Sequence, residues 1–215
     1  MSNYEFDMQS GISRTKKLIR DLARPVLIAV AGWTCSGKSF FSEKLAIEIG
    51  KEEAVSIIFL DNYFKDFDDI CFPKNEKGNL LFDVPYAYLQ EEFLNGVNLI
   101  MSGIDTRMPD YDIKTNKRIS KAGKFIKAEP LIICEGLFTI NMLSRTPHKV
   151  IKIFIDTDAA LCFTRRINRD TNLYGVSNGM VEWTFRTKVL PYSKRFVEPQ
   201  KCLADVIVKN DFERR

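Results

Sequence analysis

The stretch GWTCSGKS, residues 32–39, follows the apolar run PVLIAV and is the segment that predicts the fold most directly. In this stretch, Gly32 and Gly37 enclose four residues, and Lys38 and Ser39 follow at once. Glycines at this spacing let successive backbone N–H groups point into one concavity, where a lysine and a hydroxyl can meet phosphate and Mg²⁺. Because a buried strand precedes the stretch and a helical segment follows it, we interpret it as a phosphate-binding P-loop rather than a glycine-rich turn. We expect it to bind a nucleoside triphosphate through Gly32, Trp33, Thr34, Cys35, Ser36, Gly37, Lys38, Ser39 and Phe40.

The segments on either side of this loop alternate between strands and helices. Apolar strands are predicted at residues 25–32, 54–61, 130–136, 149–158 and 203–210, and helices at 12–23, 39–49 and 159–174. Strands of this kind alternating with helices are typical of a parallel sheet that is covered on both faces. We therefore predict an α/β fold of the P-loop NTPase type, with a mostly parallel five-stranded sheet. We expect residues 1–215 to form one domain, in which 1–24 are an N-terminal helical extension.

Residues 62–127 interrupt the alternation. Their first part is polar and rich in turn residues, residues 84–103 have the apolar spacing of an amphipathic helix, and residues 106–127 show the short alternation of a β-ribbon. We interpret this segment as a substrate-binding insertion between two halves of the sheet.

Composition excludes several classes of protein. No apolar run approaches the ~20 residues that a membrane span requires, and the polar N-terminus lacks the layout of a signal peptide, so we expect a cytoplasmic protein without a membrane partner. The five cysteines lack C-x-x-C spacing, which argues against a disulfide framework and a zinc site. A net charge of +4 fits an anionic small molecule as well as nucleic acid. The single histidine is His148, so acid–base chemistry falls either to it or to a carboxylate.

Two carboxylates end apolar strands at the edge where open α/β sheets bind ligands. Asp61 can accept a proton from an attacking hydroxyl there, or it can cap the backbone of the loop. Glu135 resembles the acidic residue that P-loop enzymes place near Mg²⁺, although a strand-ending carboxylate also occurs without that role. We expect Ser39 and Glu135 to hold the metal.

Three arginines form a cluster on the helix predicted at residues 159–174. Arg165, Arg166 and Arg169 are neighbours on a helix, and their mutual repulsion is relieved by an anion such as a transferring phosphate. The alternative is a solvated basic face that pairs with Asp158 and Asp170.

Two further positions carry weaker signals. Asp83, in LFDVP, either binds a ligand or is the N-cap of the helix that follows. Tyr111, beside Asp112 on the ribbon, either stacks on a flat ligand or serves packing.

With these residues identified, the chain resembles the uridine kinase (uridine–cytidine kinase) branch of the phosphoribulokinase/uridine kinase family of P-loop kinases. The resemblance covers about residues 25–210 and rests, besides the P-loop, on LDNYF, FDVP, PDYDIKTNKR, ICEG, IDTDAALCFTRRINRD and LADVIV, in the family's order. It implies an enzyme that uses ATP and Mg²⁺ to phosphorylate the 5′-hydroxyl of a nucleoside, from uridine or cytidine to UMP or CMP. It also implies a helical lid over about residues 164–184.

The resemblance assigns roles residue by residue. Asp61 is the implied general base, and Lys38 and Arg169 assist catalysis. Arg165 and Arg169 join the ATP site, and Asp83 holds ribose hydroxyls with the help of Arg166. The implied substrate-binding residues are Asp61, Phe64, Phe82, Asp83, Tyr111, Asn116, Arg166 and Thr184.

The chain departs from the family at five positions. Asn116 and Thr184 stand where the family has a histidine and a glutamine that face the base. Phe64 replaces a tyrosine near the general base, and Tyr174 and Val176 replace two lid arginines. A pocket without these hydrogen-bonding partners discriminates poorly, so we expect weak or broad activity on pyrimidine nucleosides.

Two alternatives stay open. One is a kinase of the same superfamily that acts on a sugar acid, pantothenate or nicotinamide riboside. The other is a P-loop NTPase that hydrolyses without transfer, although the sequence has no N-K-x-D guanine motif and no long basic stripe for nucleic acid. The expected partner is a small molecule rather than nucleic acid. The family often forms tetramers, so the resemblance also implies a homo-oligomer.

Overall fold

The computed structural model of the protein describes residues 5–119 and 123–211, and its centre is a parallel sheet. The sheet has six strands in the order β1-β10-β9-β2-β8-β3, and every pair of neighbours is parallel. The strands are β1 (Glu5–Phe6), β2 (Val26–Gly32), β3 (Val55–Phe59), β8 (Leu131–Glu135), β9 (Val150–Asp156) and β10 (Val206–Lys209). The five predicted strands are all present. The sixth, β1, pairs with β10 and is too short to show an alternation pattern in the sequence.

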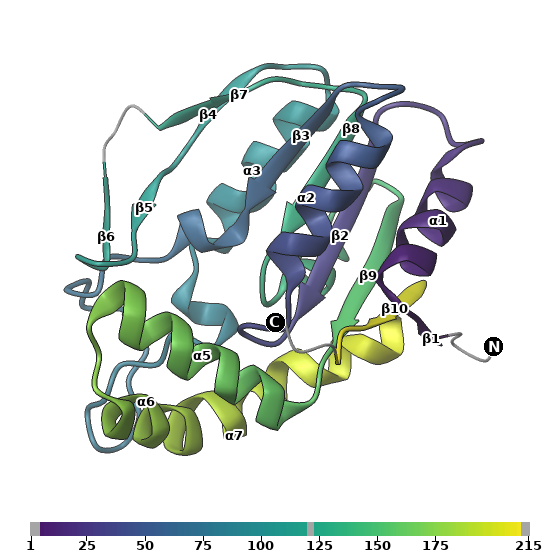
Figure 1. Ribbon diagram of the computed structural model, residues 1–215. Helices are drawn as coiled ribbons and strands as arrows, with labels where there is room; N and C mark the ends of the chain where they lie inside the picture. The colour runs from purple at the N-terminus through teal and green to yellow at the C-terminus, as the bar shows by residue number, and fades with distance from the viewer. Residues whose placement is uncertain (1–4, 120–122, 212–215) are drawn as a thin grey trace.

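Helices cover both faces of this sheet (Figure 1). The helices of the described residues are α1 (Met8–Ile19), α2 (Lys38–Ile49), α3 (Gln90–Met101), α4 (Thr139–Leu143), α5 (Ala159–Tyr174), α6 (Asn178–Thr184) and α7 (Leu190–Tyr192). Because successive side chains of a strand point to opposite faces, Ile28 of β2 packs with residues of α1 and α2, and Ala29 packs with residues of α3 and α4. All of β2 is buried, which explains its unbroken apolar run.

The N-terminal helix begins and ends earlier than predicted. The expected range is 12–23, whereas α1 covers Met8–Ile19, because the Asp7 carboxylate accepts a hydrogen bond from the Ser10 backbone N–H at 2.8 Å and caps the helix there. Gly11 lets α1 approach β10 closely, since a Cβ at this position would lie 2.6 Å from Val208 Cγ2. The extension is therefore packed onto the sheet.

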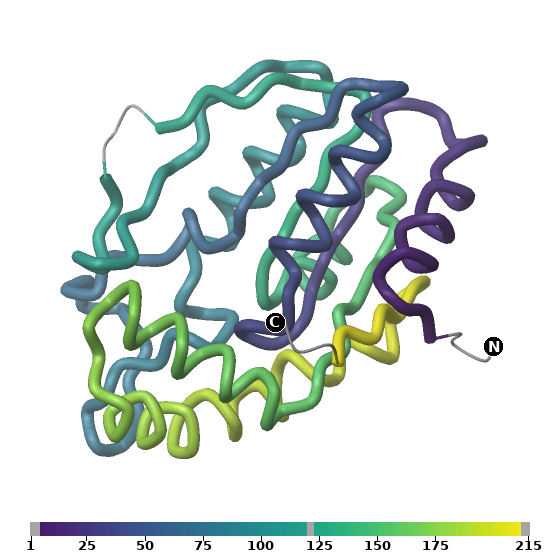
Figure 2. The backbone as a smooth tube through the Cα atoms, in the orientation of Figure 1, coloured from purple at the N-terminus to yellow at the C-terminus, as the bar shows by residue number. Residues whose placement is uncertain are grey.

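The insertion contains the predicted helix and ribbon. Helix α3 is preceded by a short 3-10 turn, Pro85–Ala87, so the regular helix is shorter than the range 84–103. The ribbon consists of two antiparallel pairs, β4 (Thr106–Met108) with β7 (Lys124–Ile126) and β5 (Tyr111–Asp112) with β6 (Lys117–Arg118). Figure 2 shows these teal segments on the side of the molecule away from α1. Residues 120–122 of the expected ribbon lie outside the described residues.

The C-terminal third of the chain crosses the carboxyl ends of the strands. Helices α5 and α6 run past the end of the sheet where β2 leads into α2 (Figure 1). Beyond α6, two π-helical turns, Phe185–Val189 and Ser193–Val197, flank α7 and lead into a 3-10 segment, Glu198–Leu203. All five cysteines are unpaired. No helix in the described ranges has the length and apolarity that a membrane crossing demands.

Candidate active site

The P-loop connects the end of β2 to the start of α2 in a conformation that requires its glycines. Gly32 and Gly37 have φ values of +153° and +98°. A Cβ at Gly32 would lie 2.5 Å from the Ile155 carbonyl oxygen, and one at Gly37 would lie 2.2 Å from Asn210 Nδ2. Both glycines are therefore fixed by the backbone conformation and by close neighbours.

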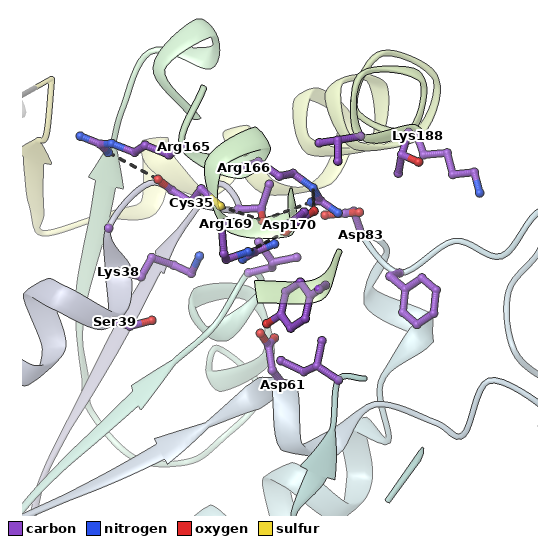
Figure 3. Close-up of a pocket in the computed structure, with 18 of the residues that line it drawn as sticks. Cys35, Lys38, Ser39, Asp61, Asp83, Arg165, Arg166, Arg169, Asp170 and Lys188 are labelled. Carbon is purple, nitrogen blue, oxygen red and sulfur yellow. Dashed lines mark hydrogen bonds and ion pairs between the residues drawn. The ribbon is translucent and has the colours of Figure 1, made fainter. Parts of the chain in front are cut away.

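The backbone carbonyl of Ser36 connects the P-loop to neighbouring segments of the chain. The Ser36 oxygen accepts hydrogen bonds from Asn210 Nδ2 at 2.6 Å, Thr157 Oγ1 at 2.9 Å and Arg165 at 3.4 Å. Arg165 also donates to the carbonyls of Cys35 and Asn210 at 3.4 and 3.1 Å. Figure 3 shows the Arg165 guanidinium turned toward the loop backbone and away from Lys38. Its expected contact with ATP stays a prediction, and its observed hydrogen bonds orient the loop.

The side chains of Lys38 and Ser39 in the P-loop donate hydrogen bonds to other groups of the protein. Lys38 is 8% exposed, and its ammonium donates to the Trp33 carbonyl at 2.9 Å. The Ser39 hydroxyl donates to Glu135 Oε2 at 3.1 Å. Burial raises the pKa of Glu135 to about 7, and the positive charge of Lys38 opposes that shift. A buried carboxylate in this state gains from a nearby cation.

The donor set of Ser39 and Glu135 fits Mg²⁺. Both residues offer oxygen atoms, and Mg²⁺ is commonly bound by one or two protein ligands together with phosphate oxygens and water. Within the described ranges, no group of three or more His, Cys, Asp or Glu side chains is arranged to hold a metal by itself. A Mg²⁺ ion held by Ser39 and Glu135 would complete its coordination with phosphate oxygens and water.

Asp61 lies in a 3-10 turn, Leu60–Tyr63, directly after β3, and faces the same space. The cavity exposes its carboxylate, and Oδ1 accepts a hydrogen bond from the Tyr88 hydroxyl at 3.3 Å. Desolvation by the surrounding protein raises the pKa of Asp61, while the charge of Lys38 and the hydrogen bond from Tyr88 oppose the rise. Its side chain does not cap the loop, since its one hydrogen bond within the described residues comes from Tyr88.

Asp170 holds two arginines of the predicted cluster. Arg166 Nε lies 3.1 Å from Asp170 Oδ2, and Arg169 Nε lies 2.8 Å from Asp170 Oδ1. Arg166 also donates to Thr34 Oγ1 at 3.3 Å and is only 17% exposed, so it is not part of a solvated face. Asp158, the other expected partner, instead caps α5 by accepting from backbone N–H groups. Figure 3 shows Arg166 and Arg169 over the space between Lys38 and Asp83.

Asp83 lies at the far end of this space without a partner of its own. Its side chain is 9% exposed and receives no hydrogen bond from the described residues. The N-cap alternative is wrong, because α3 begins after Leu89 and the preceding turn begins after Val84. Burial raises the pKa of Asp83, and Arg166 opposes the shift. Asp83 is thus free to bind a ligand.

Aromatic side chains surround the Asp83 end. The Phe64 ring lies 5.7 Å from Phe82 and 5.5 Å from Tyr111, measured between centroids. Tyr111 is 7% exposed, and its hydroxyl donates to the Lys65 carbonyl at 3.4 Å, so packing is part of its role. Asn116, with φ +52°, lies in the turn between β5 and β6.

One cavity of about 1170 Å³ joins these groups. Of the predicted site residues, the following line it: Thr34, Cys35, Gly37, Lys38, Ser39, Phe40, Asp61, Phe64, Phe82, Asp83, Tyr111, Asn116, Glu135, Arg165, Arg166, Arg169 and Thr184. Gly32, Trp33 and Ser36 belong to the P-loop but do not line the cavity. Trp33 is 8% exposed and Trp183 of α6 is 45% exposed, and neither ring lines the cavity.

Further cavity residues carry no motif in the sequence. They include Glu43, Lys188, Tyr192 and Asn210. Asp170, an expected partner of the arginine cluster, lines the cavity as well, and so do Tyr174 and Val176, where the chain departs from the family. Asn210 follows the last strand, so the rule that ligands meet the carboxyl ends of strands points to it. Nothing in the local sequence points to Lys188.

A sequence profile of the Phosphoribulokinase / Uridine kinase family matches residues 27–213. The chain belongs to this family. Uridine kinases of Deinococcus deserti and Clostridium novyi are each 32% identical to it, and the alignments cover 86% and 87% of this chain and 87% and 88% of theirs.

Solved structures show the same fold. A possible uridine kinase from Bacillus stearothermophilus has a TM-score of 0.65 at 15% identity, with 94% of this chain and 98% of that chain covered. A D-glycerate 3-kinase from Cryptococcus neoformans has a TM-score of 0.63 at 14% identity, with 89% and 86% covered. Both activities in the name of the Phosphoribulokinase / Uridine kinase family move a phosphoryl group onto a hydroxyl. The predicted family, α/β P-loop fold and phosphotransferase class are therefore confirmed.

Proposed function

We propose that this family member uses ATP and Mg²⁺ to phosphorylate the 5′-hydroxyl of a nucleoside, with uridine or cytidine as acceptor. The observation that carries the proposal is the continuous cavity, which has Lys38 at one end, Asp61 near its middle and Asp83 at the other end. Its volume of about 1170 Å³ exceeds that of the usual pocket for one small ligand. The relatives named uridine kinase support the choice of acceptor.

The donor end supplies positive charge and a metal site. Lys38 and the N-terminus of α2 face the phosphates, and Arg169 adds charge where the phosphoryl group moves. Ser39 and Glu135 would hold Mg²⁺, which neutralises phosphate charge when it is bound.

Asp61 is the proposed general base. It accepts the proton of the acceptor hydroxyl while that oxygen bonds to the γ-phosphorus, the bond from this phosphorus to the β,γ-bridging oxygen breaks, and ADP leaves with the bridging oxygen. A raised pKa makes the Asp61 carboxylate a stronger base at neutral pH. Asp83, with Arg166 beside it, would hold the ribose hydroxyls, and Asn116 and Thr184 would face the base.

The proposal is tested by product analysis on an Asp61→Asn variant. The amide keeps the shape but cannot accept the proton, so phosphorylation of uridine should fall by roughly 10²–10⁴-fold while ATP still binds. Mass spectrometry of the product and ADP release should agree one to one in the unmodified protein. A matched control is Asp68→Asn, because Asp68 is exposed and pairs with Lys117 outside the cavity. Full activity in Asp61→Asn, or ADP release without a phosphorylated product, would contradict the proposal.

One observation favours a second candidate, an acceptor that carries a carboxylate, such as a sugar acid or pantothenate. Lys188 lines the cavity and forms no ion pair with a carboxylate of the described residues. Burial lowers the pKa of Lys188, and the charge of Asp83 opposes that shift. The Lys188 ammonium lies over the Trp183 ring, 5.0 Å from its centroid. A partly desolvated ammonium without a carboxylate partner favours an anionic group on the ligand.

A matched pair of acceptors separates the two candidates. Nicotinic acid riboside and nicotinamide riboside differ only in a carboxylate and an amide. If the acceptor carries a carboxylate, kcat/KM should be higher for nicotinic acid riboside than for nicotinamide riboside. The Lys188→Met variant should lose this preference for the acid. Lys194→Met is the control, since Lys194 is exposed and lies outside the cavity. Preference for uridine over both, unchanged in Lys188→Met, would support the nucleoside proposal.

A further inference from the structure

Tyr88 is a buried residue whose hydroxyl reaches the Asp61 carboxylate. Its side chain is 2% exposed, and the hydroxyl donates to Asp61 Oδ1 at 3.3 Å. No other hydrogen bond reaches the Asp61 side chain from residues 5–119 or 123–211. The second carboxylate oxygen is therefore left for a ligand in the cavity.

Packing holds this hydroxyl in place. The Tyr88 ring stacks on Phe64 with centroids 4.1 Å apart and an interplanar angle of 26°, and it meets the edge of Phe138 at 5.7 Å. The backbone of Tyr88 forms a bridge to Phe64, and the next N–H, that of Leu89, donates to the Tyr63 carbonyl at 2.8 Å. The turn that carries Asp61 and the segment that carries Tyr88 are thus held together both by ring packing and by backbone contacts.

We propose that Tyr88 is a positioning residue for Asp61, whose hydroxyl holds Oδ1 and directs the other oxygen toward the acceptor hydroxyl. This inference rests on the proposed role of Asp61 as the base. A base that takes a proton in the transition state must be held within a fraction of an ångström of its productive place. A hydrogen bond from a rigid ring does this without adding charge.

The hydroxyl acts only as a donor. Burial and the neighbouring charges of Asp61 and Asp83 raise the pKa of Tyr88 well above its usual value. Tyr88 therefore keeps its proton throughout the reaction and does not compete with Asp61 for the proton of the acceptor. After transfer, the proton resides on the oxygen of Asp61 that Tyr88 does not contact.

The test begins with Tyr88→Phe, which keeps the ring stack and removes only the hydroxyl. We expect kcat to fall roughly tenfold with little change in KM for ATP, because a hydrogen bond to a charged group has about this weight. In the unmodified protein the hydrogen bond from Tyr88 lowers the pKa of Asp61. Without this bond the pKa of Asp61 should be higher, and the acid limb of the kcat/KM profile should move to higher pH. The other charged groups that act on Asp61 from neighbouring elements, or on which Asp61 acts, are Lys38, Asp83, Glu135 and Arg169.

Tyr63→Phe is the matched control. Tyr63 lies in the same turn as Asp61, is 1% exposed, and its hydroxyl has no partner within the described residues. Its removal should leave both kcat and the pH profile unchanged. Unchanged kcat and pH profile in Tyr88→Phe would overturn the inference.

A double-mutant cycle distinguishes positioning from a general structural effect. If Tyr88 acts through Asp61, Tyr88→Phe should cost nothing further in an Asp61→Ala background. An equal loss in both backgrounds would overturn the inference and leave the proposed function standing. Full activity in Asp61→Ala alone would instead refute the base assignment, and with it the role of Tyr88.

Discussion

Asp83 shows how a single residue can trade stability for binding. It is buried at the acceptor end of the cavity, and burial raises its pKa while Arg166 opposes the rise. Because the pKa in the folded state lies above that in the unfolded state, the folded protein binds more protons between the two values. Its stability should therefore fall as pH rises from the ordinary pKa of an aspartate through the raised one.

Asp83→Asn should stabilise the protein and weaken acceptor binding. At pH 8 the amide removes the cost of a buried charge, so Tm should rise by a few degrees, and the gain should shrink as pH falls toward the ordinary pKa of aspartate. KM for the acceptor should rise in the same variant. Differential scanning fluorimetry across pH and steady-state kinetics measure both effects. Asp21→Asn, at an exposed position of α1's C-terminal flank, is the control, and an equal Tm change there would contradict the argument.

At the scale of elements, the P-loop depends on the end of β10. Asn210 holds the Ser36 carbonyl at 2.6 Å and also lies where a side chain at Gly37 would have to be. Asn210→Ala should loosen the loop and raise KM for ATP by about 3- to 10-fold, with a smaller effect on kcat, since the loop still carries Lys38. Kinetics at varied ATP measure this. Asn172→Ala, on the exposed side of α5, should leave KM unchanged. An unchanged KM for ATP in Asn210→Ala would show that the other two donors suffice.

Helix α1 lies outside the segment that matches the family, yet its packing makes it part of the core. Ile12 is 4% exposed and belongs to a buried cluster that includes Phe41 of α2 and Val208 of β10. Ile12→Ala should lower the free energy of unfolding by about 2–4 kcal/mol, as for other large-to-small core changes. Urea unfolding measures the loss, and Lys17→Ala on the exposed face should cost far less. A loss equal to that of Lys17→Ala would mean that α1 is not integral to the fold.

The sequence was informative about elements with strong periodicity and less so about contacts between them. The helix 159–174 is observed with its predicted bounds, and Lys38, Ser39, Asp61, Glu135 and Arg169 lie around one cavity, as strand ends and motif spacing indicate. The start of α1 differs because it depends on one capping side chain, Asp7.

Contacts across the chain could not be read from local patterns. Tyr88 and Asp61 are 27 residues apart, and tertiary contacts such as the packing of Tyr88 on Phe64 and Phe138 bring the hydroxyl to the carboxylate. The departure at Phe64 predicts the loss of a hydroxyl near the base, and the structure supplies one from Tyr88 instead. The turn of Arg165 toward the Ser36 carbonyl likewise depends on where β10 ends.

At the scale of the whole molecule, the candidate active site lies at one end of the parallel sheet. The cavity lies at the carboxyl ends of the strands, whereas His148 precedes β9 and lies at the amino end of that strand. His148→Ala should therefore leave kcat and KM within about twofold of the unmodified protein, since most surface changes away from a site have small effects. Steady-state kinetics with uridine and ATP test this. A large loss of kcat with a normal Tm would require a base other than Asp61.

The two tryptophans of the protein provide an intrinsic fluorescence signal at two different places. Trp33 lies in the P-loop at 8% exposure and Trp183 on α6 at 45%, so one indole ring is shielded from water and the other is partly exposed to it. Fluorescence of a Trp183→Phe variant would report on the surroundings of the P-loop alone, and fluorescence of Trp33→Phe on the surroundings of α6 alone. Stopped-flow measurements on the two variants can then follow changes around the P-loop and around α6 separately, without an attached dye.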